Sequence, residues 1–224
     1  MGINYNIYCN ETCSAIGQLL ELTPSKLLDE ISRSIQINQI DGDQVVFHEG
    51  QEADGMYAIC HGSLKLVKNI GKSNEQIVLL SAPSEMMGIS SIFNGEKLHY
   101  TAIAMETSRI CFLPRTSIMK LIEVNPQVLM ALMRKVNKTI EEIEKHTTLV
   151  MADDSETIVL KTMQELKGKF GTDPEGFIRI QIPVKDLANY LCMSKTNLYR
   201  VLNNLRERLI LQYDVDRYRL YDRH

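Results

Sequence analysis

The chain has 224 residues, of which 44% are apolar, and this is enough for hydrophobic cores in two modest domains. Its longest apolar runs fall far short of the roughly 18–20 residues that span a bilayer, and a secretory signal pattern is missing, so we expect a cytoplasmic location and no membrane partner. The net charge of −3 does not favour nucleic acid, but residues 183–224 carry eight Lys or Arg against five Asp or Glu, which permits a local basic surface.

The first half of the chain changes from a helical to a strand pattern. Leu and Ile recur at helical spacing between residues 19 and 31, where Thr23 can cap a helix and Pro24 can take its first position. From Ile35 to Leu113, short β-branched and aromatic runs alternate with turn formers, and these runs lie at 45–47, 56–59, 64–67, 77–80, 101–104 and 110–113. The spacing predicts a β-roll or jelly roll, and with the helices around it an α+β fold.

After Pro114 the pattern is helical to about residue 152. One apolar stripe follows this segment, and we take its dimer-forming positions to be Leu132, Val136, Ile140, Ile143 and Thr147. A helix of this length has more apolar surface than one small barrel covers, which favours pairing with a second copy as a coiled coil. The alternative is a long helix that packs only on its own chain.

A second domain follows a short hinge at residues 151–155. Apolar residues between Ile158 and Phe170 predict a further helix, residues 171–176 a turn, and residues 177–182 a strand. We therefore expect an N-terminal helix and β-roll sensor domain at 1–115, a dimerisation helix with its hinge at 116–152, and a C-terminal domain at 153–224.

Residues 184–208 have the pattern of a helix-turn-helix. Leu187, Leu191, Leu198 and Leu202 supply the apolar positions of two helices, small Ala188 permits a close crossing, and Ser194 is a good N-cap for the second helix. Cys192 stands where Gly is expected in the turn, which makes a left-handed backbone there costlier. Alternation from Leu211 to Tyr221 predicts a two-stranded wing.

In such a unit the start of the second helix enters the major groove. This places Lys195, Thr196 and Arg200 at the base edges of double-stranded DNA. Contacts to the DNA backbone are expected from Lys185, Ser194, Asn197 and Tyr199. For every one of these residues, simple solvation of a surface side chain is the alternative.

The order of helix, β-roll, long helix and winged helix-turn-helix resembles the family of the cyclic-AMP receptor protein and the fumarate-nitrate reductase regulator (the CRP/FNR family). The resemblance covers nearly the whole chain from about Leu19, and its carriers are residues 42–50, 56–66, 125–126 and 183–210. It implies a homodimeric transcription regulator that binds a palindromic DNA operator and contacts RNA polymerase. Family members with Glu at the second position of the recognition helix read cytosine with it, whereas Thr196 stands there in this chain, so their half-site does not carry over.

The resemblance also indicates where an effector would bind. Members that bind cyclic nucleotides carry a Gly-Glu-Leu turn and an Arg before a Ser/Thr-Ala pair, but this chain has Ile89 in place of the Glu and Tyr100 or His99 in place of the Arg. Losing the guanidinium removes the strongest phosphate contact, so cyclic AMP is not expected. The corresponding pocket is therefore expected to bind another ligand or none. Its residues are Gly88, Ile89, Ser90, His99, Tyr100 and Thr101.

The cysteines leave a redox alternative open. Iron-sulfur members of the family use an N-terminal cysteine cluster and one cysteine in a late roll strand, which here correspond to Cys9, Cys13 and Cys111. Four thiolates are the usual requirement, and a third N-terminal cysteine is missing. An iron-sulfur cluster, haem and a thiol switch therefore stay open as signals, while Cys60 and Cys111 are most simply core residues.

An enzyme is the remaining alternative, as a cupin-like metal barrel that would use His48, His61 and His99. Such barrels need clustered ligands on adjacent strands, and a His-x-His pair does not occur in the sequence. We therefore predict no metal site and no enzymatic activity.

Overall fold

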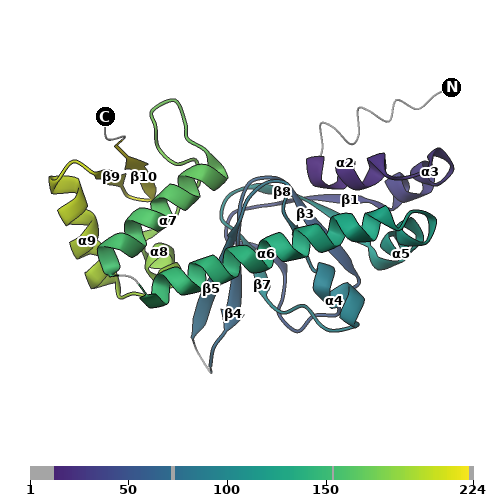
Figure 1. Cartoon of the computed structure of the whole chain (residues 1–224), viewed down its shortest axis with the longest axis horizontal. Coiled ribbons are helices and arrows are strands. Elements are labelled where there is room, and N and C mark those ends of the chain that lie inside the picture. Colours follow the sequence, from purple (N-terminus) through teal and green to yellow (C-terminus); the bar gives the residue numbers. More distant parts are fainter. Residues whose placement is uncertain (1–12, 72–73, 153, 222–224) are drawn as a thin grey trace. The chain divides into compact units, whose positions relative to one another are not determined.

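The computed structural model describes residues 13–71, 74–152 and 154–221, and two compact units make up the chain (Figure 1). The first unit consists of Met1–Glu75 and Leu80–Glu141, and the second of Gln76–Leu79 and Glu142–His224. Both helices and strands contribute, which confirms the predicted α+β class. In the part of the chain that the structure describes, no helix combines the length and apolar composition that crossing a bilayer requires.

A β-roll forms the centre of the first unit. Its two four-stranded sheets have the strand orders β1-β8-β3-β6 and β2-β7-β4-β5. The strands are β1 (Gln36–Ile40), β2 (Val45–Phe47), β3 (Gly55–His61), β4 (Leu64–Asn69), β5 (Glu75–Ser81), β6 (Met86–Met87), β7 (Thr101–Ala104) and β8 (Ser108–Pro114). All six predicted runs lie within these strands. Strands β1 and β6 are additional to the prediction.

The turn between β3 and β4 shows why a glycine is needed in the roll. Gly62 has a φ of 87°, a conformation that residues with a Cβ rarely adopt. A Cβ at this position would also lie 2.8 Å from the Cα of Ser108, the first residue of β8. The backbone of β8 therefore approaches this turn too closely for any side chain.

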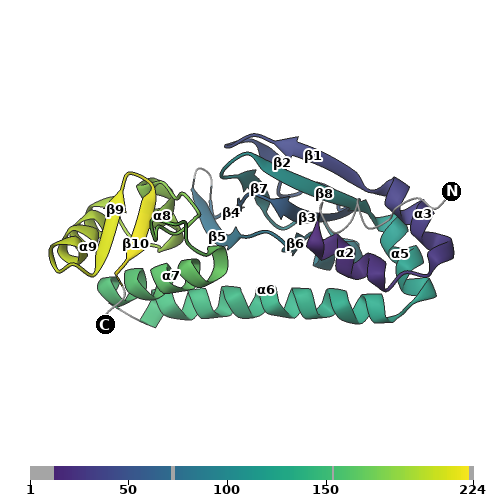
Figure 2. The same ribbon diagram turned by 90° about the horizontal axis from the view of Figure 1, so that it is seen from above.

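Helices cover one sheet of the roll. They are α2 (Ser14–Glu21), α3 (Ser25–Ser34), α4 (Ile89–Asn94) and α5 (Arg115–Val124), and their apolar sides join β3 and β8 in one hydrophobic core (Figures 1 and 2). The predicted roles of Thr23 and Pro24 are wrong in detail. Pro24 is itself the N-cap of α3, and the Thr23 hydroxyl donates to the carbonyl of Leu19 in the preceding helix (3.1 Å).

The helical segment after Pro114 is divided in two at Asn125-Pro126. The Asn125 side chain accepts a hydrogen bond from the Gln127 backbone N–H (3.0 Å), which satisfies one of the free donors at the start of α6 (Gln127–Ala152). Helix α6 is 26 residues long and reaches the predicted hinge. Asp154 caps the next helix, α7 (Ser155–Phe170), by accepting from the N–H groups of Glu156 and Thr157. The described part of the hinge thus consists of helix ends.

The second unit continues with α8 (Val184–Tyr190), α9 (Lys195–Glu207) and a hairpin of β9 (Leu211–Asp214) and β10 (Arg217–Leu220) (Figure 2). The predicted strand at 177–182 is wrong, because this segment contains only an isolated bridge from Ile178 to Thr172. Its apolar residues are nevertheless buried, and the N–H groups of Ile178 and Ile182 donate to the carbonyls of Tyr218 and Asp216. The segment therefore packs beside the hairpin without joining its ladder.

Candidate DNA-binding surface and sensor residues

Helices α8 and α9 form the predicted helix-turn-helix on an apolar frame. Leu187, Leu191, Leu198 and Leu202 are almost fully buried, and so is Ala188. The chain between the helices turns at Cys192, whose φ of 53° is left-handed as anticipated for this position. The Ser194 side chain then accepts a hydrogen bond from the Asn197 N–H (3.2 Å) and caps α9 as predicted.

The first two turns of α9 present polar side chains to solvent. Lys195, Thr196, Tyr199 and Arg200 are all exposed. The Arg200 guanidinium donates to the Asn197 side-chain oxygen (2.8 Å). Because both groups are on α9, this hydrogen bond restricts the guanidinium before any ligand is present.

Asn197 uses both ends of its side-chain amide within the chain. Its oxygen holds Arg200, and its nitrogen donates to the hydroxyl of Ser155 at the start of α7 (2.8 Å). The structure therefore gives Asn197 a bracing position, and the DNA-backbone contact predicted for it would require these hydrogen bonds to open. Lys185, in the first turn of α8, is exposed.

Several basic residues of the second unit are engaged in ion pairs. Arg208 contacts Glu156 (2.6 Å), and Arg217 contacts Asp173 (2.6 Å) and Glu175 (3.2 Å). Arg217 also lies over the ring of Phe177, which fixes the turn at 171–176 against the hairpin. Part of the positive charge of the C-terminal segment is thus neutralised by ion pairs within the unit. The basic side chains of Lys195 and Arg200, at the start of α9, are exposed to an anionic partner.

The exposed apolar residues of α6 differ from the predicted stripe. Leu132 is fully buried in the core of its own unit, and Val136 packs against that core, because the roll covers this side of the helix. Among the predicted positions, Ile140 and Thr147 are exposed, and Ile143 is half-buried. Ile140 lies instead on a second line of exposed apolar residues with Met130, Met133 and Met151, and their steps of three, seven and eleven residues all fall on the three-and-four pattern of a coiled-coil seam.

The predicted effector residues lie around α4 and β7. Gly88 has a φ of 83° and precedes α4, Ile89 is buried in the hydrophobic core, and Ser90 is exposed. The side chain of Lys68 lies beside His99 and Tyr100. Its ammonium group pairs with Glu49 (3.5 Å), donates to the His99 carbonyl (3.2 Å) and lies over the Tyr100 ring. The Thr101 hydroxyl accepts from the Glu49 N–H (3.0 Å). Lys68, a cation beside His99 and Tyr100, is therefore already bound by its own chain.

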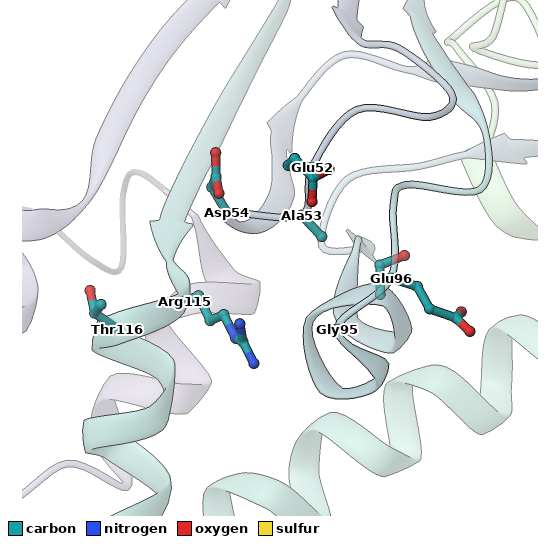
Figure 3. Close-up of a pocket in the computed structure, with 8 residues that line it drawn as sticks. Glu52, Ala53, Asp54, Gly95, Glu96, Arg115 and Thr116 are labelled. Atoms are coloured by element: carbon teal, nitrogen blue, oxygen red, sulfur yellow. The ribbon is translucent and has the colours of Figure 1, made fainter.

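A cavity of about 250 Å³ opens in the first unit, and its lining differs from the predicted set. Figure 3 shows Arg115, in the first turn of α5, pointing into the space beside the turn at Gly95 and Glu96. The remaining lining residues are Glu52, Ala53, Asp54, Ser91 and Thr116. The cavity thus offers one cation, three carboxylates and two hydroxyls to a polar ligand.

Three cysteine sulfurs meet inside the first unit. Cys13, at the N-cap of α2, Cys60 on β3 and Cys111 on β8 have their sulfurs within 4.8 Å of one another. Cys13 and Cys111 were the predicted redox candidates, and Cys60 was interpreted only as a core residue. Cys9, the third predicted candidate, lies outside the described residues. The sequence contains no local signal for Cys60, because its partners are far away in the chain.

The thiols of this cluster titrate together. Hydrogen bonds from Cys111 and Cys60 hold the pKa of the Cys13 thiol well below its ordinary value, and the backbone at Ala15 and Ile16 adds to this effect. The pKa of Cys111 is raised, chiefly because its proton is shared with Cys13. The cluster therefore favours one thiolate, at Cys13, that is stabilised by two protonated thiols.

A buried histidine in the second unit was not singled out by the sequence. His146 of α6 stacks on the ring of Tyr190, with 3.8 Å between ring centroids and 3° between planes. Its Nε2 donates to the Tyr190 carbonyl (2.9 Å), because a carbonyl can only accept, and its Nδ1 has no hydrogen-bond partner among the described residues. Burial lowers the pKa of His146. The neutral ring joins α6 to the end of α8.

Comparison with known proteins agrees with this architecture. Residues 38–125 match the family model described as cyclic nucleotide-binding domain. The chain is 24% identical to the transcriptional activator protein Anr of Pseudomonas protegens, over 84% of this chain and 77% of that protein. It is 25% identical to the fumarate and nitrate reduction regulatory protein of Vibrio cholerae, over 92% and 83% of the two chains. The solved structure of FixK2 from Bradyrhizobium japonicum superimposes with a TM-score of 0.76 at 19% identity, covering 84% and 93%.

A β-roll followed by a long helix and a winged helix-turn-helix defines the chain as a DNA-binding transcription regulator, not an enzyme. More narrowly, its sensor half is similar to the cyclic nucleotide-binding domain, and the relatives it matches are Anr-type and fumarate and nitrate reduction regulators, in agreement with the CRP/FNR resemblance indicated by its sequence motifs.

Proposed function

We propose that the chain acts as a homodimer that binds a palindromic operator in double-stranded DNA, with the start of α9 in the major groove. The observation that carries this proposal is the exposed group of Lys195, Thr196 and Arg200 on a helix whose other side is anchored by buried leucines. Arg200 is the main base-reading residue, because Asn197 already orients a guanidinium that can donate two hydrogen bonds to guanine.

The remaining contacts position the protein on the duplex. Lys185, Ser194 and Tyr199 are assigned to the phosphate backbone, and Asn197 acts mainly by holding Arg200. Division into a sensor at 1–115, a dimerisation segment at 116–152 and a DNA-binding domain at 153–224 follows from these roles. Because the target is DNA, we place the action of the protein in the cytoplasm, with RNA polymerase as a further partner.

Dimerisation is assigned to α6. The exposed line of Met130, Met133, Ile140 and Met151 supplies an apolar seam, and polar Asn137 at a seam position would fix the register of the two helices. This assignment replaces Leu132 and Val136 of the original stripe, since the roll already covers them. On the same spacing Thr147 is a seam position, seven residues after Ile140, and Ile143 lies beside the seam.

The signal is proposed to be something other than cyclic AMP. Lys68 lies beside His99 and Tyr100, the expected phosphate-binding positions, and Glu49, the His99 carbonyl and the Tyr100 ring hold it. A cyclic phosphate would have to displace these contacts. It would not gain the bidentate hydrogen bonds to a guanidinium that stabilise the bound phosphate in nucleotide-dependent members. Adding cyclic AMP should therefore leave the DNA affinity unchanged.

The test is a selection of bound sequences from random duplexes, followed by titration of the best one. We expect a palindrome with half-sites about one helical turn, roughly 34 Å, apart. Arg200→Ala should weaken binding by about 1–3 kcal/mol and relax the preference at one base pair, while Lys185→Ala should weaken all sequences equally. Arg33→Ala, an exposed arginine on α3, is the matched control. Equal binding by the wild type and Arg200→Ala would contradict the proposal.

A further inference from the structure

The three sulfurs of Cys13, Cys60 and Cys111, which we call the thiol cluster, meet from three separate elements. Cys13 and Cys111 are 4% and 2% exposed, and Cys60 is half-buried beside them. All pairs of sulfurs are within 4.8 Å. A core that needed only small apolar groups could be built with Ala or Val, whereas three soft donor atoms in one place are the ligand set of a thiophilic metal.

We propose that the thiol cluster binds one thiophilic metal ion, of the class of Zn²⁺, through its three sulfurs. A Zn–S bond is about 2.3 Å long, so two sulfurs on the same ion lie at most roughly 4.6 Å apart. The observed limit of 4.8 Å requires only small side-chain adjustments to reach that distance. This metal site is independent of the proposed DNA contacts.

An iron-sulfur cluster fits the same residues less well. Such a cluster is held by four thiolates, and in a four-iron cluster each thiolate binds a different iron, which keeps the sulfurs farther apart than one ion does. The described residues offer three sulfurs that already lie at single-ion spacing. The ligand set also includes Cys60, which has no counterpart in the cysteine pattern expected from iron-sulfur members of the family.

The charge of the thiol cluster favours a cation. Cys13 occupies the N-cap position of α2, and a cysteine at a helix N-terminus is favoured as the thiolate. A buried anion is costly unless it is paired, and a divalent ion would neutralise it. Because cysteines bind a metal as thiolates, binding should release protons and the affinity should rise with pH.

The metal would act as a clip between α2 and the sheet. Its ligands join the start of α2 to β3 and β8, while α2 otherwise packs on these strands through apolar residues such as Ile16 and Leu20. Because ligands bind the ion in the docked arrangement only, metal affinity adds to the stability of α2 docking. Amide hydrogen exchange in residues 14–21 should therefore slow when metal is bound.

The experiment adds Zn²⁺ to the full-length protein after anaerobic purification, reduction and removal of metal. We expect one tightly bound Zn²⁺ per chain, X-ray absorption showing three sulfur ligands at about 2.3 Å, and an affinity that rises with pH. Cys13→Ser, Cys60→Ser and Cys111→Ser should each weaken Zn²⁺ binding at least 100-fold. Cys192→Ser changes an exposed cysteine of the second unit and is the matched control.

Three outcomes would overturn the proposal. They are wild-type protein that binds no Zn²⁺, wild-type protein that carries stoichiometric iron and sulfide before its metal is removed, and Zn²⁺ affinity that depends on Cys9 or Cys192 but not on Cys60. If a serine variant fails to fold, the sulfur number from X-ray absorption on the wild type still decides the question. Because these measurements contain no DNA, a failure here leaves the DNA-binding proposal standing, and a failure of DNA binding leaves the metal site standing.

Discussion

The exposed face of α9 that we propose to contact DNA and the thiol cluster place their polar groups in opposite ways. On α9 the leucines face inward, while Lys195, Thr196 and Arg200 face solvent. In the thiol cluster the reactive atoms themselves are in the core, on a helix and two strands. The proposed DNA contacts and the buried residues that stabilise α9 are therefore different residues, whereas the proposed metal ligands of the cluster are themselves core residues.

This difference has a physical consequence for substitution. A polar tip on α9 can change with little effect on folding, because exposed side chains away from special backbone features usually alter stability by less than about 0.5 kcal/mol. A change in the cluster alters core packing and ligand chemistry together.

The largest effect is expected from the frame of the helix-turn-helix. Leu202 is fully buried between α9 and its neighbours, so Leu202→Ala should cost about 2–5 kcal/mol of unfolding free energy. Thr196→Ala on the exposed side of the same helix is the control and should change stability by less than about 0.5 kcal/mol. Urea unfolding followed by circular dichroism measures both. Similar losses for the two variants would show that α9 does not separate frame from function.

The next largest effect is expected at the turn between β3 and β4 of the roll. Gly62→Ala adds a Cβ 2.8 Å from the Ser108 Cα at a left-handed φ, and we expect a loss of about 1–3 kcal/mol or more. Gly95 also has a positive φ, but nothing lies within 4 Å of its added Cβ, so Gly95→Ala isolates the cost of conformation alone. The expected order of unfolding midpoints is wild type, Gly95→Ala and then Gly62→Ala. Equal losses would mean that β8 can move away from the turn.

A pH dependence should follow from His146. Its pKa is lowered by burial, so the unfolded chain takes up a proton at higher pH than the folded chain does. The contribution of His146 to stability is therefore complete above its ordinary pKa of 6.5 and declines as the pH falls from there to the lowered folded-state pKa.

Removing the titrating group tests this account. His146→Gln keeps an amide donor for the Tyr190 carbonyl, and it should flatten the decline of stability below about pH 6.5. His48→Gln changes an exposed histidine of the first unit and should leave the decline in place. Thermal unfolding at several pH values provides the comparison. A decline that persists in full in His146→Gln would assign it to other groups.

Local patterns in the sequence predicted most of the fold. Alternation located the six main strands, and the spacing of Leu187, Leu191, Leu198 and Leu202 located the helix-turn-helix, because each depends on residues close together in the chain. Strand β1 was missed because its residues are mostly exposed and polar, and β6 because it has only two residues. Residues 177–182 alternate like a strand, but they hydrogen-bond to the hairpin at isolated points only.

Features that depend on distant residues could not be predicted in the same way. Periodicity gave one stripe on α6, but only the folded roll shows that Leu132 is covered by its own chain and that Met130 and Met133 are not. Cys60 reads as an ordinary strand residue until β3, β8 and α2 come together. The candidate DNA contacts could be predicted from the sequence because they lie close together on one helix. The bracing role of Asn197 could not, because it depends on Ser155 of α7.

The smallest effect is expected at Cys192. This residue is a cysteine, like those of the thiol cluster, but it lies in the turn before α9. Its φ of 53° is left-handed, and such a backbone costs a residue with a Cβ roughly 1–2 kcal/mol. Cys192→Gly removes that cost but gives the unfolded chain more freedom, which takes back about 0.4–1 kcal/mol. Cys192→Ala loses the same sulfur and keeps the strained backbone, so it is the proper reference. We expect Cys192→Gly to be more stable than Cys192→Ala by about 0.5–1 kcal/mol in urea unfolding. An equal or lower stability of the glycine variant would mean that the turn is not strained, and that the absence of glycine there has no energetic cost.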